Sequence, residues 1–155
     1  MQIKELVLKN FKSFDYARIP FKPGFQVIVG PNGAGKSNII DALLFGFGST
    51  SLKRLRVDKI SNLVNQSAKE RTARVRIVFN QDGKDIDITR EIDESGRSVF
   101  FLDGKRKAMN EITSFLEETG ISADGYYTVQ EGDVTRIINM SPEERRKIIE
   151  DICGI

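Results

Sequence analysis

The stretch Gly30-Pro31-Asn32-Gly33-Ala34-Gly35-Lys36-Ser37 decides the fold of this 155-residue chain. It has the spacing G-x-x-x-x-G-K-S and lies between a short apolar run, 25–29, and a segment with apolar residues at helical spacing, 37–47. A loop so rich in glycine can turn its backbone N–H groups inward around an anion. The pattern therefore predicts a phosphate-binding loop (P-loop) between a strand and a helix, in an α/β fold.

The side chains of this loop suit a nucleoside triphosphate bound with Mg²⁺. The free N–H groups and the positive end of the following helix would face the anion. We expect Lys36 to lie across the β- and γ-phosphates and the Ser37 hydroxyl to bind Mg²⁺. A chance glycine-rich turn would have to match the whole motif and both flanking elements, so we predict a nucleoside-triphosphate site.

The rest of the chain predicts strands and helices on both sides of the loop. Residues 25–29 have the pattern of a strand buried on both faces, as inside a covered sheet. Asp-Gly and Ser-Gly pairs predict hairpin turns, so residues 72–107 should form an antiparallel meander within a mixed sheet. Ser141-Pro142-Glu143-Glu144 is a strong helix start with a capping box. The other expected elements are strands at 2–9, 14–21, 72–79, 85–92 and 98–102, a short extended segment at 126–129, and helices at 37–47, 110–118 and 142–155.

Composition excludes several kinds of site. The chain has no His, which excludes Ser/His and Cys/His dyads and imidazole metal ligands. Its single cysteine, Cys153, excludes an internal disulfide and a zinc site built from several thiolates, and suits a cytosolic protein. No apolar run approaches the ~18–20 residues that span a bilayer, so we expect no membrane contact.

Positive charge is concentrated in one stretch, although the formal net charge is only +2. Residues 53–76 contain eight Lys or Arg against two acidic residues. Such a stretch could contact nucleic-acid phosphates without reading sequence. It could equally be a solvated strand face, because Arg74 and Arg76 have the alternation of outward-pointing strand residues.

The acidic partner that a P-loop needs for hydrolysis is missing from the sequence. An apolar strand ending in Asp, the Walker B strand, should follow the P-loop, and no such run occurs. Residues 93–96 match the D-x-x-G of GTPases, but they lie in a polar turn and no N-K-x-D motif accompanies them. We therefore expect an incomplete hydrolytic site and neither a GTPase nor a small nucleotide kinase.

Four segments resemble the amino-terminal head segment of structural maintenance of chromosomes (SMC) proteins of the prokaryotic and archaeal type. They are Lys9–Phe14, Gly30–Leu43, Gly132–Val134 and Asn139–Arg146, the last of which reads N-M-S-P-E-E-R-R and is far more specific than the P-loop. The resemblance covers essentially the whole chain, 1–155. It implies the amino-terminal lobe of an ABC-type ATPase head, with 142–155 at the start of a coiled coil.

The resemblance also implies partners. In SMC proteins a distant carboxy-terminal segment supplies the signature motif and the Walker B strand, and two heads sandwich two ATP molecules. ATP binding closes the heads and hydrolysis reopens them, which organises DNA together with a kleisin subunit. We therefore expect a homodimer that binds DNA largely independently of sequence, in the cytoplasm at the nucleoid. This chain alone should be inactive as an ATPase.

Residue roles carry over from the family by position. The implied nucleotide contacts are Lys12, Ser13, each residue from Gly30 through Ser37, Asn38 and Arg56. Asn32 would face the γ-phosphate, and Arg56 would couple nucleotide to DNA. Without the family match, Lys12 and Ser13 could be an ordinary polar turn and Arg56 a solvated side chain. The basic stretch supplies the candidates for weak DNA contact, which are Arg54, Arg56 and Lys59.

One departure from the family concerns the Mg²⁺ site. SMC proteins usually have Gln directly before Gly-Asp, whereas this chain reads Gln130-Glu131-Gly132-Asp133. A gapless match gives the role of holding Mg²⁺ and the attacking water to Glu131, and a shift by one gives it to Gln130. The two side chains of an extended segment point to opposite sides, so only one can reach the metal.

Two other functions compete with the SMC hypothesis. The SMC-like double-strand-break repair ATPase shares the N-F-[KR]-S opening and the P-loop, although the M-S-P-E-E-R-R segment suits SMC better. A P-loop-bearing DNA-binding module is the other alternative, and the basic stretch 53–76 supports it.

Overall fold

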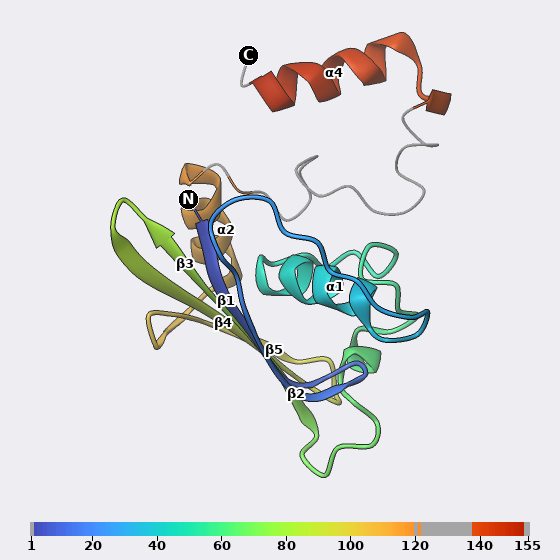
Figure 1. Cartoon of the computed structure of the whole chain (residues 1–155), viewed down its shortest axis with the longest axis vertical. Coiled ribbons are helices and arrows are strands. Elements are labelled where there is room, and N and C mark those ends of the chain that lie inside the picture. Colours follow the sequence, from blue (N-terminus) through green and yellow to red (C-terminus); the bar gives the residue numbers. More distant parts are fainter. Residues whose placement is uncertain (1, 120, 122–137, 154–155) are drawn as a thin grey trace. The chain divides into compact units, whose positions relative to one another are not determined.

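The computed structural model describes residues 2–119, 121 and 138–153. They belong to two compact units, Met1–Ala123 and Asp124–Ile155. The first unit contains a six-stranded sheet with two α-helices packed on it (Figure 1). The second contains helix α4, Pro142–Cys153.

All six strands of the sheet run antiparallel to their neighbours, in the order β2-β1-β3-β4-β5-β6. Strands β3 to β6 form the meander predicted for residues 72–107, with the turns at the expected Gly-containing pairs. The prediction of a mixed sheet is wrong for this part of the chain. The strands are β1 (Gln2–Phe11), β2 (Phe14–Pro20), β3 (Thr72–Gln81), β4 (Lys84–Asp93), β5 (Ser98–Leu102) and β6 (Lys105–Lys107).

The strand predicted at 25–29 is not formed. These residues are irregular, and Phe25 and Val29 are 94% and 83% exposed. An apolar run of this kind becomes a buried strand only when neighbouring strands satisfy its backbone and cover its faces. No described strand pairs with residues 25–29, which explains why the sequence pattern and the structure differ here.

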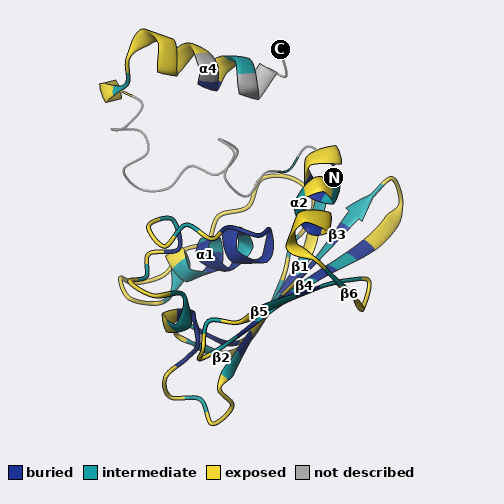
Figure 2. Ribbon diagram, turned by 180° about the vertical axis from the view of Figure 1, so that it is seen from behind, coloured by how far each residue is buried: buried dark blue, intermediate teal, exposed yellow. Residues whose placement is uncertain are grey.

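Two helices cover the same face of the sheet: α1 (Lys36–Gly46) and α2 (Met109–Glu118). Gly46 of α1 lies against Ile77 of β3, and Phe115 of α2 packs on Phe79 of β3 with ring centroids 6.2 Å apart. Residues 77 and 79 point to the same side of the strand because side chains alternate with a period of two. Figure 2 shows the buried side of α1 that results.

The carboxy-terminal end of α1 is fixed to the meander by a buried cation. Arg90 of β4 is 2% exposed and donates to the carbonyls of Phe45 and Ser49 at 2.9 and 2.8 Å and to Ser98 Oγ at 2.8 Å. Its guanidinium also lies over the rings of Phe45 and Phe100, at 4.1 and 4.7 Å from the centroids. Burial lowers the pKa of Arg90 to about 10, so the side chain is charged at neutral pH.

Helix α4 begins as its sequence predicts. The Ser141 N–H donates to Glu144 Oε2 at 2.8 Å, and the Glu144 N–H donates to Ser141 Oγ at 3.3 Å. This reciprocal pair is a capping box, and Pro142 is the first helical residue. The extended segment expected at 126–129 lies outside the described residues. Over the part of the chain that the structure describes, no helix has the length and apolarity needed to cross a membrane.

Candidate functional site

The P-loop wraps the amino-terminal end of α1, as predicted. The Ala34 N–H donates to the Pro31 carbonyl at 3.2 Å and closes a tight turn, in which Gly33 has φ +81°. Gly35 has φ +89° and stands at the N-cap of α1, with no side chain capping the helix. The Asn38 N–H donates to the Gly35 carbonyl at 2.9 Å, and the N–H groups of Lys36 and Ser37 before it lie at the helix end where an anion can bind.

Lys36 folds back over this loop. Its ammonium donates to the carbonyls of Gly30 and Pro31, each at 2.7 Å. Asn32 lies exposed at the turn, and Ser37 lies exposed in the first turn of α1. A phosphate in the loop would therefore meet a cation and a hydroxyl from adjacent residues.

The turn between β1 and β2 lies directly against the P-loop. A methyl group on Gly35 would come 3.1 Å from both Ser13 Oγ and Phe14 Cζ. The Asn38 amide, in the first turn of α1, donates to Ser13 Oγ at 2.8 Å. The structure thus brings Ser13 and Asn38 together at the phosphate loop, although 25 positions separate them in the sequence.

A buried carboxylate that the sequence patterns did not reveal joins the two predicted cations. Asp41 of α1 is 1% exposed and accepts hydrogen bonds from both Lys12 and Arg56. Arg56 donates through Nε to Oδ1 at 3.1 Å and through Nη2 to Oδ2 at 2.6 Å. Lys12 also donates to the Leu55 carbonyl at 2.6 Å. We call Lys12, Asp41 and Arg56 the Asp41 cluster.

The electrostatics of the Asp41 cluster leave it with one excess positive charge. Burial lowers the pKa of Lys12, the hydrogen bond and charge of Asp41 oppose that effect, and the nearby Arg56 charge lowers it further. Two cations therefore share one anion. The Arg56 side chain is 44% exposed, so part of this charge faces solvent beside the P-loop.

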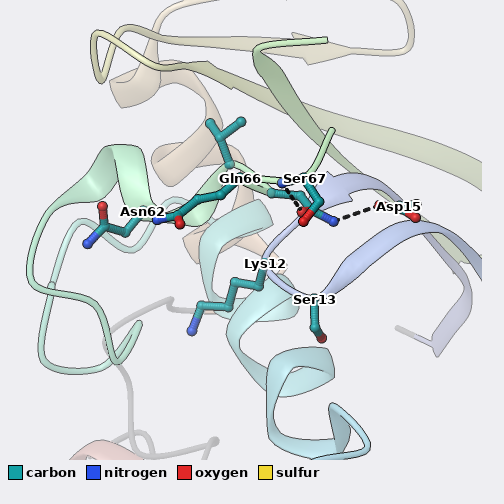
Figure 3. A pocket seen from close by; sticks show the side chains of 8 residues that line it. Lys12, Ser13, Asp15, Asn62, Gln66 and Ser67 are labelled. Carbon is teal, nitrogen blue, oxygen red and sulfur yellow. Dashed lines mark hydrogen bonds between the residues drawn. The ribbon is translucent and has the colours of Figure 1, made fainter. Parts of the chain in front are cut away.

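A polar pocket of about 460 Å³ opens on the other side of the β1–β2 turn (Figure 3). Backbone bonds hold its wall in place: the Lys12 N–H donates to the Leu63 carbonyl at 2.8 Å and the Asn65 N–H to the Asn10 carbonyl at 2.7 Å. Inside the wall, the Asn65 amide donates to Asp15 at 2.8 Å. The volume of the pocket suits a small molecule, because small-molecule sites usually measure ~300–1,000 Å³. The lining residues are Lys12, Ser13, Asp15, Asn62, Val64, Asn65, Gln66 and Ser67.

The basic stretch 53–76 divides into two parts. Its strand residues are paired across the sheet: Arg74 with Glu91 at 2.5 Å, and Arg76 with Asp87. This confirms the outward strand face that the alternation predicts. In the loop before β3, Lys59 is exposed and Arg54 is partly exposed, next to Arg56. A 3₁₀ helix, η1 (Ile60–Leu63), follows them.

Two predicted metal-site residues, Gln130 and Glu131, lie outside the described residues. Among the residues that are described, no group of three His, Cys, Asp or Glu side chains could hold a metal ion. Ser37 is thus the one predicted Mg²⁺ ligand whose position the structure gives.

Comparison of the sequence with known proteins gives one consistent family. Residues 2–141 match the sequence model of the RecF/RecN/SMC N terminal domain. The Chromosome partition protein Smc of Pyrococcus furiosus is 43% identical over 99% of this chain, and that of Aquifex aeolicus is 39% identical over 99%. The chain spans about 14% of the length of these two relatives.

Solved structures agree in fold as well as in sequence. An Smc head bound to the C-winged helix domain of ScpA has a TM-score of 0.93 and 43% identity, and the match covers 100% of this chain and 52% of that one. A chain from work on ATP-driven dimerization and DNA-stimulated activation of SMC ATPases has a TM-score of 0.89 and 42% identity, over 98% of this chain and 99% of that one. The chain therefore belongs to the RecF/RecN/SMC N-terminal domain family, as the amino-terminal region of an SMC head with the ABC-type P-loop ATPase fold.

Proposed function

We propose that this chain is the ATP-binding half of an SMC head, whose ATPase site is completed by a carboxy-terminal segment and by a second head. The observation that carries the proposal is the P-loop itself: Gly33 and Gly35 turn the backbone around the start of α1, and Lys36 lies over it. The similar SMC ATPase chain, which comes from work on ATP-driven dimerization, supports the assignment.

ATP and Mg²⁺ fit the residues of this site. The uncapped start of α1, Lys36 and the partly exposed Arg56 offer backbone and side-chain donors to a polyphosphate. The exposed Ser37 residue offers a hydroxyl oxygen, a ligand of the kind that Mg²⁺ prefers, and Gln130 or Glu131 is our candidate for a second ligand. Mg²⁺ would neutralise charge on the phosphate oxygens.

The pocket beside Lys12 is our candidate for the nucleoside end of ATP. It lies next to Ser13, which contacts Asn38 just beyond the P-loop. Amide and hydroxyl groups line it, from Asn62, Gln66 and Ser67 among others, and these can both donate and accept hydrogen bonds. A nucleoside seated there would have its phosphates directed to the P-loop across the β1–β2 turn.

The exposed run 25–29 supports a missing partner segment. It leads directly into the P-loop, and Phe25, Val27 and Val29 expose 94%, 67% and 83% of their surface. A run of exposed apolar side chains of this kind suits a strand that is covered on both faces within a further sheet. We infer that the carboxy-terminal segment of the same head supplies that sheet, and with it the Walker B and signature motifs that this sequence lacks.

The larger assembly follows from the same family membership. We propose that two such heads pair around ATP, that a kleisin-type subunit of the ScpA kind binds the head, and that DNA contacts it weakly through Arg54, Arg56 and Lys59. The protein would then act in the cytoplasm, at the nucleoid, in chromosome organisation. The solved SMC head bound to ScpA supports the kleisin partner.

The test is ATP turnover by the chain with and without its partner segment. The purified chain should hydrolyse ATP negligibly, and the head completed with the carboxy-terminal segment should hydrolyse it. K36A should abolish that activity, whereas K84A, which removes an exposed lysine at the start of β4, should leave it unchanged. Strong turnover by the chain alone would contradict the split-site proposal.

A further inference from the structure

We propose that Asp41 is a positioning residue for ATP binding, whose buried carboxylate holds Lys12 and Arg56 beside the P-loop. This inference rests on the function proposed above. Asp41 follows Ser37 by four residues on α1, so both side chains lie on the same side of the helix. Its carboxylate is 1% exposed and accepts hydrogen bonds only from protein cations, among the described contacts.

Two segments, the β1–β2 turn and the loop before η1, meet helix α1 at this carboxylate, and each of them makes more than one contact. The β1–β2 turn supplies Lys12, and its neighbour Ser13 accepts a hydrogen bond from Asn38. The loop before η1 supplies Arg56, and its neighbour Leu55 accepts one from Lys12. These contacts form a closed ring that passes through the first turns of α1. Moving Lys12 or Arg56 would therefore disturb the remaining contacts of the ring.

The backbone at Lys12 and at Arg56 has a strained conformation, which indicates that surrounding contacts fix both residues. Lys12 has φ +49° and Arg56 has φ +51°, in the left-handed region that side chains other than Gly rarely adopt. Such conformations persist where surrounding contacts fix them. The Asp41 carboxylate is the contact that Lys12 and Arg56 share, so it is the group that can set both directions at once.

Charge explains why a carboxylate near a polyphosphate site is favourable here. Asp41 alone would repel phosphate, but it is buried behind two cations and the cluster keeps a net positive charge. A buried ion pair is seldom the most stabilising choice for a helix face that packs on a core. Asp41 lies among buried apolar residues of α1, Ile39 and Ala42 included, where an apolar side chain would pack without a desolvation cost.

The experiment measures binding of a fluorescent ATP analogue to the completed head in D41N, R56Q and the double variant D41N/R56Q. D41N keeps the shape of the side chain and removes its charge. We expect D41N to weaken ATP binding about tenfold, the size of one charge-assisted hydrogen bond. D41N should cost less ATP affinity in the R56Q background than in the wild type, because one of the two cations that Asp41 holds is already absent and only Lys12 remains. D41E should bind more tightly than D41N.

The matched control is D87N, which removes a carboxylate paired with Arg76 on the meander, away from the P-loop. It should leave ATP binding unchanged. Unchanged binding in D41N, or equal losses from D41N in the wild-type and R56Q backgrounds, would overturn the role of Asp41. If the wild-type head fails to bind ATP, or K36A binds as well as wild type, the proposed function itself is wrong.

A second pair of variants covers the case in which D41N does not fold, as judged from its melting curve. K12Q and R56Q each remove one cation, and the remaining cation then has the whole carboxylate to itself. Their losses in ATP affinity should therefore add to less than the loss in K12Q/R56Q, since only the double variant leaves Asp41 without a partner. Simple additivity would overturn the proposal.

Discussion

Gly46 of α1 lies so close to Ile77 of β3 that a methyl group at Gly46 would stand 2.5 Å from Ile77 Cδ1. Val75 Cγ1 would lie 3.3 Å from the same position. Gly46 is buried and Ile77 is fully buried, so neither can move aside into solvent. The absence of a side chain at Gly46 therefore sets how closely α1, and the P-loop at its other end, approaches the sheet.

We expect G46A to lower the free energy of unfolding by about 1–3 kcal/mol, the usual cost of overpacking a core. I77V removes the methyl group that G46A would meet, and alone it should cost about 0.5–1.5 kcal/mol. The double variant should lose less stability than the sum of the two single variants. Urea denaturation measures all three, and strict additivity would contradict the contact as the source of the cost.

We expect G35A to abolish ATP binding. Ala at φ +89° is strained, and its methyl group would come 3.1 Å from Ser13 and Phe14. G24A is the matched control, because Gly24 has a similar φ of +94° but nothing within 4 Å of the added methyl group. Titration with a fluorescent ATP analogue should show loss in G35A alone. Equal losses in both variants would point to backbone strain rather than to the P-loop.

We expect R90M to lower the free energy of unfolding by about 3 kcal/mol, because the carbonyls of Phe45 and Ser49 lose a buried donor. The pKa of Arg90 is lowered to about 10, which still lies above neutral pH. Arg90 is thus protonated in the folded and unfolded states below that value. Its contribution to stability should stay constant between about pH 6 and 9. A loss that grows or shrinks within this window would contradict the assignment.

We expect R54E/K59E in the completed head to weaken DNA binding. The slope of log K against log salt should fall by about 2, because the two substitutions remove two side chains that neutralise phosphates. R71E/R74E is the matched control, since it makes the same change of charge at two arginines for which we propose no DNA contact. Filter binding at several salt concentrations measures the slope. An equal reduction in both variants would indicate a general charge effect instead of a defined contact.

We expect F25D/V29D to prevent the chain from associating with the carboxy-terminal segment, while its melting temperature stays near that of the wild-type chain. Both side chains are exposed, so the charges cost little before association and much after burial. M109D is the control, because Met109 is 40% exposed and an acidic residue is favourable at the start of α2. Co-purification reports the outcome. If F25D/V29D associates as strongly as the wild-type chain, residues 25–29 are not the strand that joins the carboxy-terminal segment.

The local parts of the fold could be predicted from the sequence. The P-loop, the hairpins of the meander and the starts of α1 and α4 depend on residues that are neighbours in the chain, such as Gly33 with Gly35 or Ser141 with Glu144. The strand expected at 25–29 failed because an apolar run indicates burial without saying what buries it. Its neighbours in a sheet would have to come from residues other than those described.

Asp41 was missing from the site predicted from the sequence, because its contacts also depend on residues far away in the chain. Lys12 and Arg56 were found by resemblance, but Asp41 looked like one more position of an amphipathic helix. Its role depends on cations 29 positions before it and 15 after it, and no local pattern marks such a contact. The pocket behind the β1–β2 turn was missed likewise, since its wall forms only when residues 62–67 pair with the end of β1.

Positive side chains from other elements hold helix α1 at both of its ends. It has 11 residues and is therefore about 16 Å long. Lys12 and Arg56 donate hydrogen bonds to Asp41 near the P-loop, and Arg90 of β4 donates to the Phe45 carbonyl at the far end of the helix. Any displacement of the P-loop along the helix axis would therefore strain the Arg90 contacts on the meander as well as the contacts of Lys12 and Arg56.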